Sequence, residues 1–182
     1  MTEGSQAWRH RAVWLIIVIG GFALRLYRLG AQSLWYDETV SAYLASQSIP
    51  RLVAHTAGDI HPPGYYVFLH LWLRLAGDSE FALAFFSLVF GVLLIALSFA
   101  LARRLLGQTA ALWSALLVAT SPYNVWYSQE VRMYTLGAVL GLVTLWCALE
   151  IANQRIGKSA NRQIGKHLHC AQVQVSANLW IN

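Results

Sequence analysis

The sequence predicts an all-α, polytopic bundle of transmembrane helices, with short interfacial helices in its first outer loop. Three observations lead to this fold class. Of the 182 residues, 57% are hydrophobic and only 12% are charged, whereas a soluble domain carries about 25% charged residues. The apolar residues gather in runs of about 20, the length that crosses a bilayer. The basic residues flank these runs and do not line one face, which is typical of membrane spans and argues against a nucleic-acid partner.

Four apolar runs are long enough to be predicted as membrane spans. They lie at about residues 12–29, 81–102, 108–127 and 131–152. A fifth apolar stretch, residues 61–76, opens with two prolines near its start and contains His70 and Arg74. It is short for a span, and charges within lipid are costly. We therefore predict that residues 61–76 are interfacial or re-entrant.

The basic clusters indicate the topology. They are Arg9 with Arg11, Arg103 with Arg104, and Arg155 with Lys158. All three clusters fall on the cytoplasmic side only if residues 61–76 do not span. This arrangement predicts a cytoplasmic N-terminus and outer loops at residues 30–80 and 128–132. Basic residues are normally enriched on the cytoplasmic side of membrane spans, but Arg25 and Arg28 lie at the outer end of the first run. We interpret them as extending to the interface or binding a phosphate.

The first outer loop is expected to contain two short helices lying on the membrane surface. The first runs from Asp37 to Ser48, because apolar residues recur there at helical spacing, and Pro50 ends it. The second runs from Arg51 to His55. In the third span, Pro122 is expected to loosen the helix and free backbone polar groups that need partners.

The chain divides into a membrane domain, residues 1–152, and a polar tail, residues 153–182. The tail contains the near repeat NQRIGK and NRQIGK, and is interpreted either as a disordered cytoplasmic segment or as sequence foreign to the original fold. Cys147 and Cys170 form neither a metal-ligand spacing nor a disulfide framework. No metal site is predicted and no glycine-rich phosphate loop is present. We predict no cofactor, with a divalent cation left open.

Polar residues gather in three clusters, each just outside a predicted span. They are residues 35–38 (WYDE), 61–66 (HPPGYY) and 128–134 (SQEVRMY). Such positions would meet both a lipid-anchored molecule and a polar one. Asp37 and Glu38 fit a general base, but position alone favours a helix N-cap followed by a first-turn acid.

Arg132 opposes the dipole of the helix that follows it, so it needs an anion. That anion is either Glu130 or a bound phosphate, which a guanidinium can hold with two hydrogen bonds. His61 precedes Pro62 and so sits on extended backbone. It either binds a phosphate or a sugar hydroxyl, or is a solvated loop residue.

The three clusters together resemble the GT-C membrane glycosyltransferases of the protein O-mannosyltransferase and aminoarabinose transferase type. The resemblance rests on SLWYDE, HPPGYY and SQEVRMY, in that order, over residues 14–150. Family members often have arginine where this chain has Ala84, and they are much longer. The chain is therefore interpreted as an N-terminal part of such an enzyme.

The resemblance implies transfer of a sugar from a polyprenyl-phosphate donor to an unknown acceptor at the outer face of a bacterial inner membrane. Asp37 would be the catalytic base, and Glu38 and Glu130 would be further acidic residues of the catalytic site. Substrate binding is assigned to His61, Arg132, Tyr65 and Tyr134. Two alternatives remain open: a non-catalytic protein that binds or translocates a lipid phosphate, and an inactive truncated gene product.

Overall fold

The computed structural model describes residues 3–58 and 61–155, and every regular element in these ranges is a helix. The helices are α1 (Glu3–Leu26), α2 (Tyr36–Ser46), α3 (Ile49–Thr56), α4 (Gly64–Ala76), α5 (Glu80–Leu106), α6 (Gln108–Thr120), α7 (Pro122–Tyr127) and a last helix, Tyr134–Arg155. The predicted all-α fold class is confirmed. Of the predicted tail, residues 156–182 lie outside the described residues.

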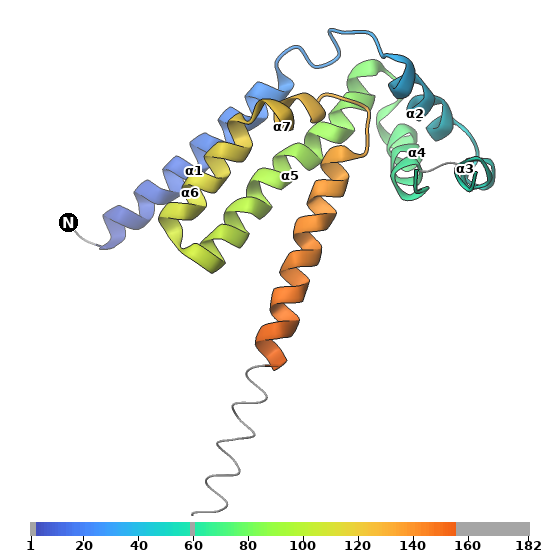
Figure 1. The fold of residues 1–182 in the computed structure, drawn as a ribbon. Helices are drawn as coiled ribbons and strands as arrows, with labels where there is room; N and C mark the ends of the chain where they lie inside the picture. Colours follow the sequence, from blue (N-terminus) through green and yellow to red (C-terminus); the bar gives the residue numbers. More distant parts are fainter. Residues whose placement is uncertain (1–2, 59–60, 156–182) are drawn as a thin grey trace, which may run out of the picture. The chain divides into compact units, whose positions relative to one another are not determined.

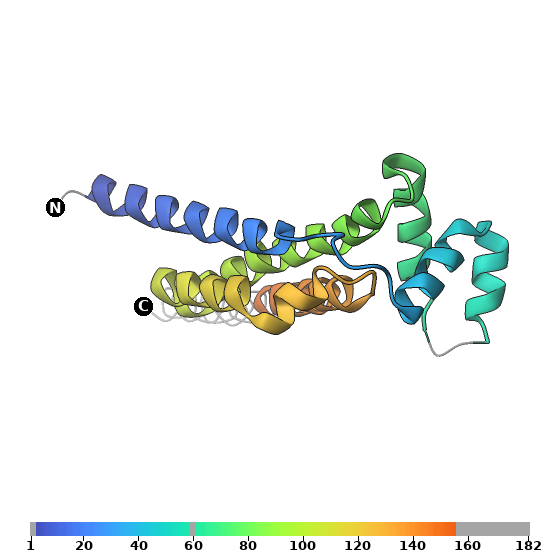
Figure 2. The ribbon, with the colours of Figure 1, turned by 90° about the horizontal axis from the view of Figure 1, so that it is seen from above.

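The chain forms two compact units, residues 1–142 and 143–182. All contacts described below lie within the first unit, which includes the beginning of the last helix. Within it, α1, α5 and α6 pack side by side, and α2 to α4 gather at the end where α1 finishes and α5 begins (Figures 1 and 2).

Two helices are long and apolar enough to cross a membrane. They are Glu80–Leu106 and Tyr134–Arg155. Capping residues account for the bounds of α5: the Ser79 hydroxyl accepts from the Ala82 N–H at its start, and Gly107 follows its last turn at φ 89°. Arg103 and Arg104 lie in that last turn, where they complement the helix dipole.

Small side chains of α6 pack against α1 and α5. Ala111, Ala115 and Ala119 recur every four residues on α6, and each is at most 2% exposed. Such a stripe of small residues lets neighbouring helix backbones approach closely. Ile17 of α1 and Ile95 of α5 pack against it.

The third predicted span, residues 108–127, is interrupted. Helix α6 ends at Thr120, and α7 begins at Pro122. Because Pro122 has no N–H, the Val118 carbonyl lacks its usual donor four residues on, and the break also strips the Ala119 carbonyl of its donor. The guanidinium of Arg25 donates to both carbonyls, at 3.1 and 3.0 Å.

The first loop contains the two expected short helices, but the second starts earlier than predicted. Helix α3 begins at Ile49, with Pro50 in its first turn, instead of at Arg51. Proline is favoured there because the N–H that it lacks would have no partner in a first turn. The proline therefore begins the second helix and does not merely end the first.

Helix α4 covers most of residues 61–76 and packs against α2, α3 and α5. His70 is buried in this contact, and its Nδ1 lies 2.7 Å from the Ala45 carbonyl, which can only accept, so Nδ1 carries the proton. The indole of Trp72 donates to the Ala82 carbonyl at 2.8 Å. Of the two polar residues that made this stretch unsuitable for lipid, His70 thus binds within the protein, whereas Arg74 is exposed.

Candidate functional site

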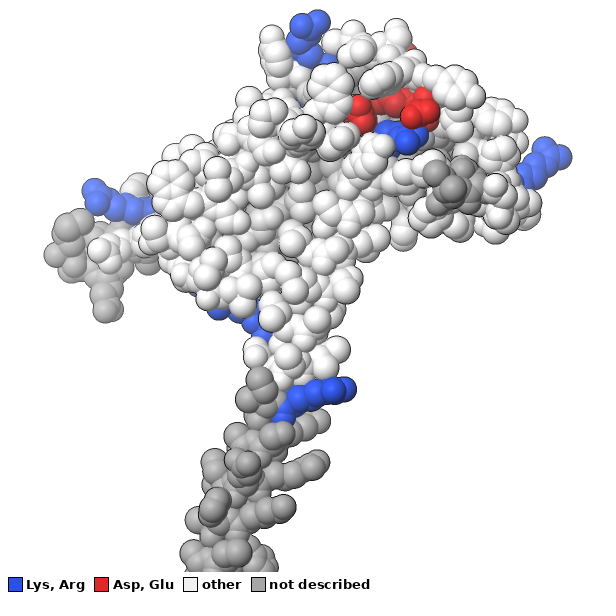
Figure 3. Space-filling view, viewed as in Figure 1, with Lys and Arg blue, Asp and Glu red and all other residues white. Residues whose placement is uncertain are grey.

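Two of the three polar clusters line one cavity of about 260 Å³. The start of α2, the end of α7 and the segment that leads into the last helix form its walls. Figure 3 shows the acidic side chains on this face gathered in one patch beside a basic one. The lining residues are Trp35, Asp37, Glu38, Trp126, Tyr127, Glu130, Arg132 and Tyr134.

Glu38 joins the two clusters. Its side chain is buried, and its two oxygens each accept a backbone N–H: Oε1 from Val131 at 2.8 Å, and Oε2 from Trp35 at 3.2 Å. The second bond fixes the start of α2, and the first reaches a residue 93 positions away. Glu38 therefore holds the acidic start of α2 against the segment that carries Glu130 and Arg132.

Asp37 and Arg132 form an ion pair in the lining of the cavity, with 3.5 Å between Oδ2 and Nη1. The Asp37 side chain is 65% exposed, whereas that of Arg132 is only 13% exposed. The guanidinium also lies 5.6 Å from the centre of the Tyr134 ring, a cation–π distance. Arg132 is thus pre-oriented at the wall, while the carboxylate of Asp37 stays open to solvent and to a ligand.

Glu130 lies in the same cavity and accepts a hydrogen bond from the indole of Trp126 at 2.5 Å. Partial burial raises the pKa of the Glu130 carboxyl above its ordinary value, and the nearby charge of Glu38 adds to the rise. The Trp126 hydrogen bond acts in the opposite direction. In the part of the chain that the structure describes, the carboxylate paired with Arg132 is that of Asp37, not that of Glu130.

A buried brace holds the segment from Ser128 to Arg132 in place. Arg25 is fully buried and donates from Nε to the Ser128 hydroxyl at 3.1 Å, besides its bonds to α6 and to the Gly21 carbonyl. The Gln129 side chain donates to the Arg25 and Tyr27 carbonyls at 3.0 and 2.8 Å. The prediction that Arg25 extends to the interface or binds phosphate is wrong, because its donors are occupied by protein groups.

Gly91 makes room for this brace. A Cβ added there would overlap the Ser128 hydroxyl oxygen and would lie 3.0 Å from Nε of Arg25. Only a residue without a side chain lets α5 pass this close to the buried guanidinium.

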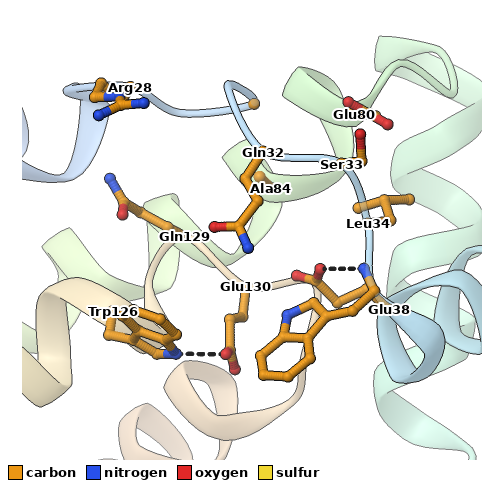
Figure 4. A pocket seen from close by; sticks show the side chains of 12 residues that line it. Arg28, Gln32, Ser33, Leu34, Glu38, Glu80, Ala84, Trp126, Gln129 and Glu130 are labelled. Carbon is orange, nitrogen blue, oxygen red and sulfur yellow. Dashed lines mark hydrogen bonds between the residues drawn. The ribbon is translucent and has the colours of Figure 1, made fainter.

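A smaller cavity of about 90 Å³ adjoins the first and shares Trp35, Glu38, Trp126 and Glu130 with it. Figure 4 shows Gln32, Gln129 and Glu130 extending toward the space between the first loop and α7. Ala84 of α5 also lines it. Gln129 belongs to the predicted SQEVRMY cluster, whereas Trp126 and Gln32 lie outside all three clusters and were not predicted as lining residues.

Two predicted substrate-binding residues lie elsewhere. Tyr65 is buried among aromatic rings of α4 and α5, which raises the pKa of its hydroxyl, and lines neither cavity. His61 precedes α4 and lines neither cavity. The structure thus brings Asp37, Glu38, Glu130, Arg132 and Tyr134 together, but neither His61 nor Tyr65 with them.

Within the described ranges, no three His, Cys, Asp or Glu side chains are placed to hold a metal ion together. The absence of a cofactor stays a prediction.

Comparison with known proteins gives one match. A family model described as dolichyl-phosphate-mannose-protein mannosyltransferase matches residues 60–159, which is more than half of the chain. No curated protein and no solved structure matches the chain. The matched range includes the HPPGYY and SQEVRMY clusters, whereas Asp37 and Glu38 precede it.

Proposed function

Because the chain belongs to the dolichyl-phosphate-mannose-protein mannosyltransferase family of GT-C type membrane glycosyltransferases, we propose that its cavity binds a sugar carried on a polyprenyl phosphate. The sugar is transferred to an acceptor at the outer face of a bacterial inner membrane. The acceptor is left unassigned.

One observation carries this proposal: an exposed carboxylate, Asp37, lies beside a shielded guanidinium, Arg132, in the lining of one open cavity. Sugar transfer from a lipid phosphate needs a base for the acceptor and a cation for the departing phosphate. These two groups stand 3.5 Å apart, so a phosphate bound to Arg132 lies next to the base.

In the proposed step, Asp37 removes the proton from an acceptor hydroxyl or amine, whose lone pair forms a bond to the anomeric carbon. The bond between that carbon and the phosphate oxygen breaks, and its electron pair stays on the phosphate. Arg132 stabilises the resulting charge with its remaining N–H groups. Glu38 acts as a positioning residue, since its two oxygens are engaged by backbone N–H groups.

Purified chain in proteoliposomes with a labelled polyprenyl-phosphate sugar tests this function. We expect Asp37→Asn to lower sugar transfer by about 100-fold or more, the typical contribution of a positioned base, while donor binding changes little. Arg132→Gln should weaken donor binding by about tenfold, because charge-assisted hydrogen bonds are lost. The matched control is Asp78→Asn, an exposed acid in the α4–α5 connection that lines neither cavity.

Transfer by Asp37→Asn at the rate of Asp78→Asn would exclude the assigned base. Donor binding by the unmodified chain without any sugar release would exclude catalysis and favour a lipid-phosphate binding or translocating protein. Transfer that stops in a chelator and returns with Mg²⁺ would contradict the prediction of no cofactor.

A further inference from the structure

A third cavity lies at the opposite end of the three-helix layer from the acidic site. It has a volume of about 410 Å³ and is formed where the N-terminal half of α1 meets the end of α5 and the start of α6. Figures 1 and 2 both place this end away from α2 to α4. The lining residues are His10, Arg11, Trp14, Phe99, Arg103 and Gln108.

The charged groups that line this cavity are two guanidinium groups, of Arg11 and Arg103. It has no acidic lining residue, and in the described ranges neither Arg11 nor Arg103 pairs with a carboxylate. The last turn of α5 favours a basic residue at position 103 through its dipole. That explanation does not apply to Arg11, which lies within α1 and lines the same cavity as Arg103.

The backbone adds positive potential. Helix α6 begins at Gln108, and its N-cap is Gly107, which provides no side-chain acceptor. The first N–H groups of this 13-residue helix therefore have no side-chain cap, and the helix dipole places partial positive charge there. Gln108 itself lines the cavity.

One wall of the cavity is aromatic. The rings of Trp14 and Phe99 lie 5.7 Å apart and tilted, and both line the cavity. The indole N–H of Trp14 is buried and has no acceptor among the described residues. The cavity thus combines an aromatic wall with two guanidinium groups that pair with no carboxylate among the described residues. It lies between α1, α5 and α6.

We propose that this cavity binds a phosphate-bearing anion, with Arg11 and Arg103 as its ligands. The chemistry fits a phosphodiester headgroup of an anionic phospholipid, since basic pockets between membrane helices hold such headgroups. It also fits free phosphate. The aromatic wall favours the lipid, because acyl chain carbons next to the headgroup can pack on it. This site is separate from the sugar-transfer site and does not depend on the function proposed for it.

The test uses the whole chain in neutral detergent, with short-chain phosphatidylglycerol, phosphatidylcholine and inorganic phosphate as probes in a calorimetric titration. We expect phosphatidylglycerol to bind more tightly than phosphatidylcholine, and its affinity to fall with added salt. Arg11→Gln with Arg103→Gln should weaken it by at least about tenfold. Arg51→Gln with Arg74→Gln, which removes two exposed arginines of α3 and α4, is the charge-matched control.

Arg11→Lys with Arg103→Lys keeps the positive charge and guards against a folding defect of the glutamine variant, which circular dichroism also checks. Its binding should lie between those of the unmodified chain and the glutamine variant. Competition between inorganic phosphate and phosphatidylglycerol supports the anion site. If inorganic phosphate binds as tightly as phosphatidylglycerol does, the ligand is a soluble phosphate and not a lipid headgroup. Equal binding of the two lipids, or equal losses in the glutamine variant and its control, overturns the proposal.

Discussion

Glu38→Gln is the most informative single substitution, because it preserves the size of the side chain and removes one of two acceptors. The carboxylate of Glu38 accepts from Val131 and from Trp35, and the side chain is only 6% exposed. An amide has one oxygen, so one N–H loses its acceptor and faces an NH₂ group. The segment that carries Glu130 and Arg132 should then separate from α2 more readily.

The cost follows from the hydrogen bonds lost. A hydrogen bond to a charged group contributes about 1.5–3 kcal/mol, and a buried unsatisfied donor costs about 1–3 kcal/mol. Replacing one such bond with a donor–donor contact should lower the free energy of local opening by about 2–4 kcal/mol. Amide exchange at Val131 would then accelerate by about 30- to 700-fold, since 1.4 kcal/mol is a factor of ten.

Hydrogen–deuterium exchange at Val131 measures this effect directly. The control is Asp37→Asn, the same chemical change at the neighbouring residue. Because the Asp37 side chain is 65% exposed and its ion-pair distance is 3.5 Å, that change should cost about 0–1 kcal/mol. Equal exchange rates at Val131 in the two variants would refute the joining role of Glu38.

Three further substitutions test the surroundings of the site. Arg25→Leu should lower the free energy of unfolding by about 3–5 kcal/mol, because it removes four hydrogen bonds and leaves the Val118 and Ala119 carbonyls unpaired. A melting temperature equal to that of Arg28→Leu would contradict the stabilising role of Arg25. Gly91→Ala should destabilise by about 1–3 kcal/mol through its clash with Ser128, whereas Gly20→Ala, which meets nothing within 4 Å, should be neutral or stabilising. The raised pKa of Glu130 means that the fold binds this proton more tightly than the unfolded chain does, so its contribution to stability is present at acidic pH and is lost as pH rises through the raised pKa. Glu130→Gln should remove that part of the pH dependence of unfolding, and a ¹³C carboxyl titration showing an ordinary or lowered pKa would disprove it.

The helices were predictable because their signals are local. Apolar runs located α1, α5, α6 and the last helix, although the predicted third span continued to residue 127, past the end of α6 at Thr120. Helical spacing also located α2. The start of α3 was missed because a proline can end one helix or begin the next, and only the backbone on both sides decides which.

The candidate site was predictable in part, for a physical reason. The acids at 37 and 130 were expected on one side, and both line the same cavity. The joining role of Glu38 was not visible, because its acceptor oxygens serve one local N–H and one from a residue 93 positions away. The role of Arg25 was missed likewise: its partners are carbonyls, which every residue has and no sequence pattern distinguishes.

The break at Pro122 has a consequence for which substitutions this chain can tolerate. Alanine at 122 would restore an N–H within reach of the Val118 carbonyl, and Arg25 would then be a buried cation with one acceptor fewer. Conversely, losing Arg25 is harmful chiefly while the proline leaves those carbonyls open. Positions 25 and 122 are 97 residues apart in the sequence. We therefore expect a substitution at one of them to be tolerated only together with a substitution at the other.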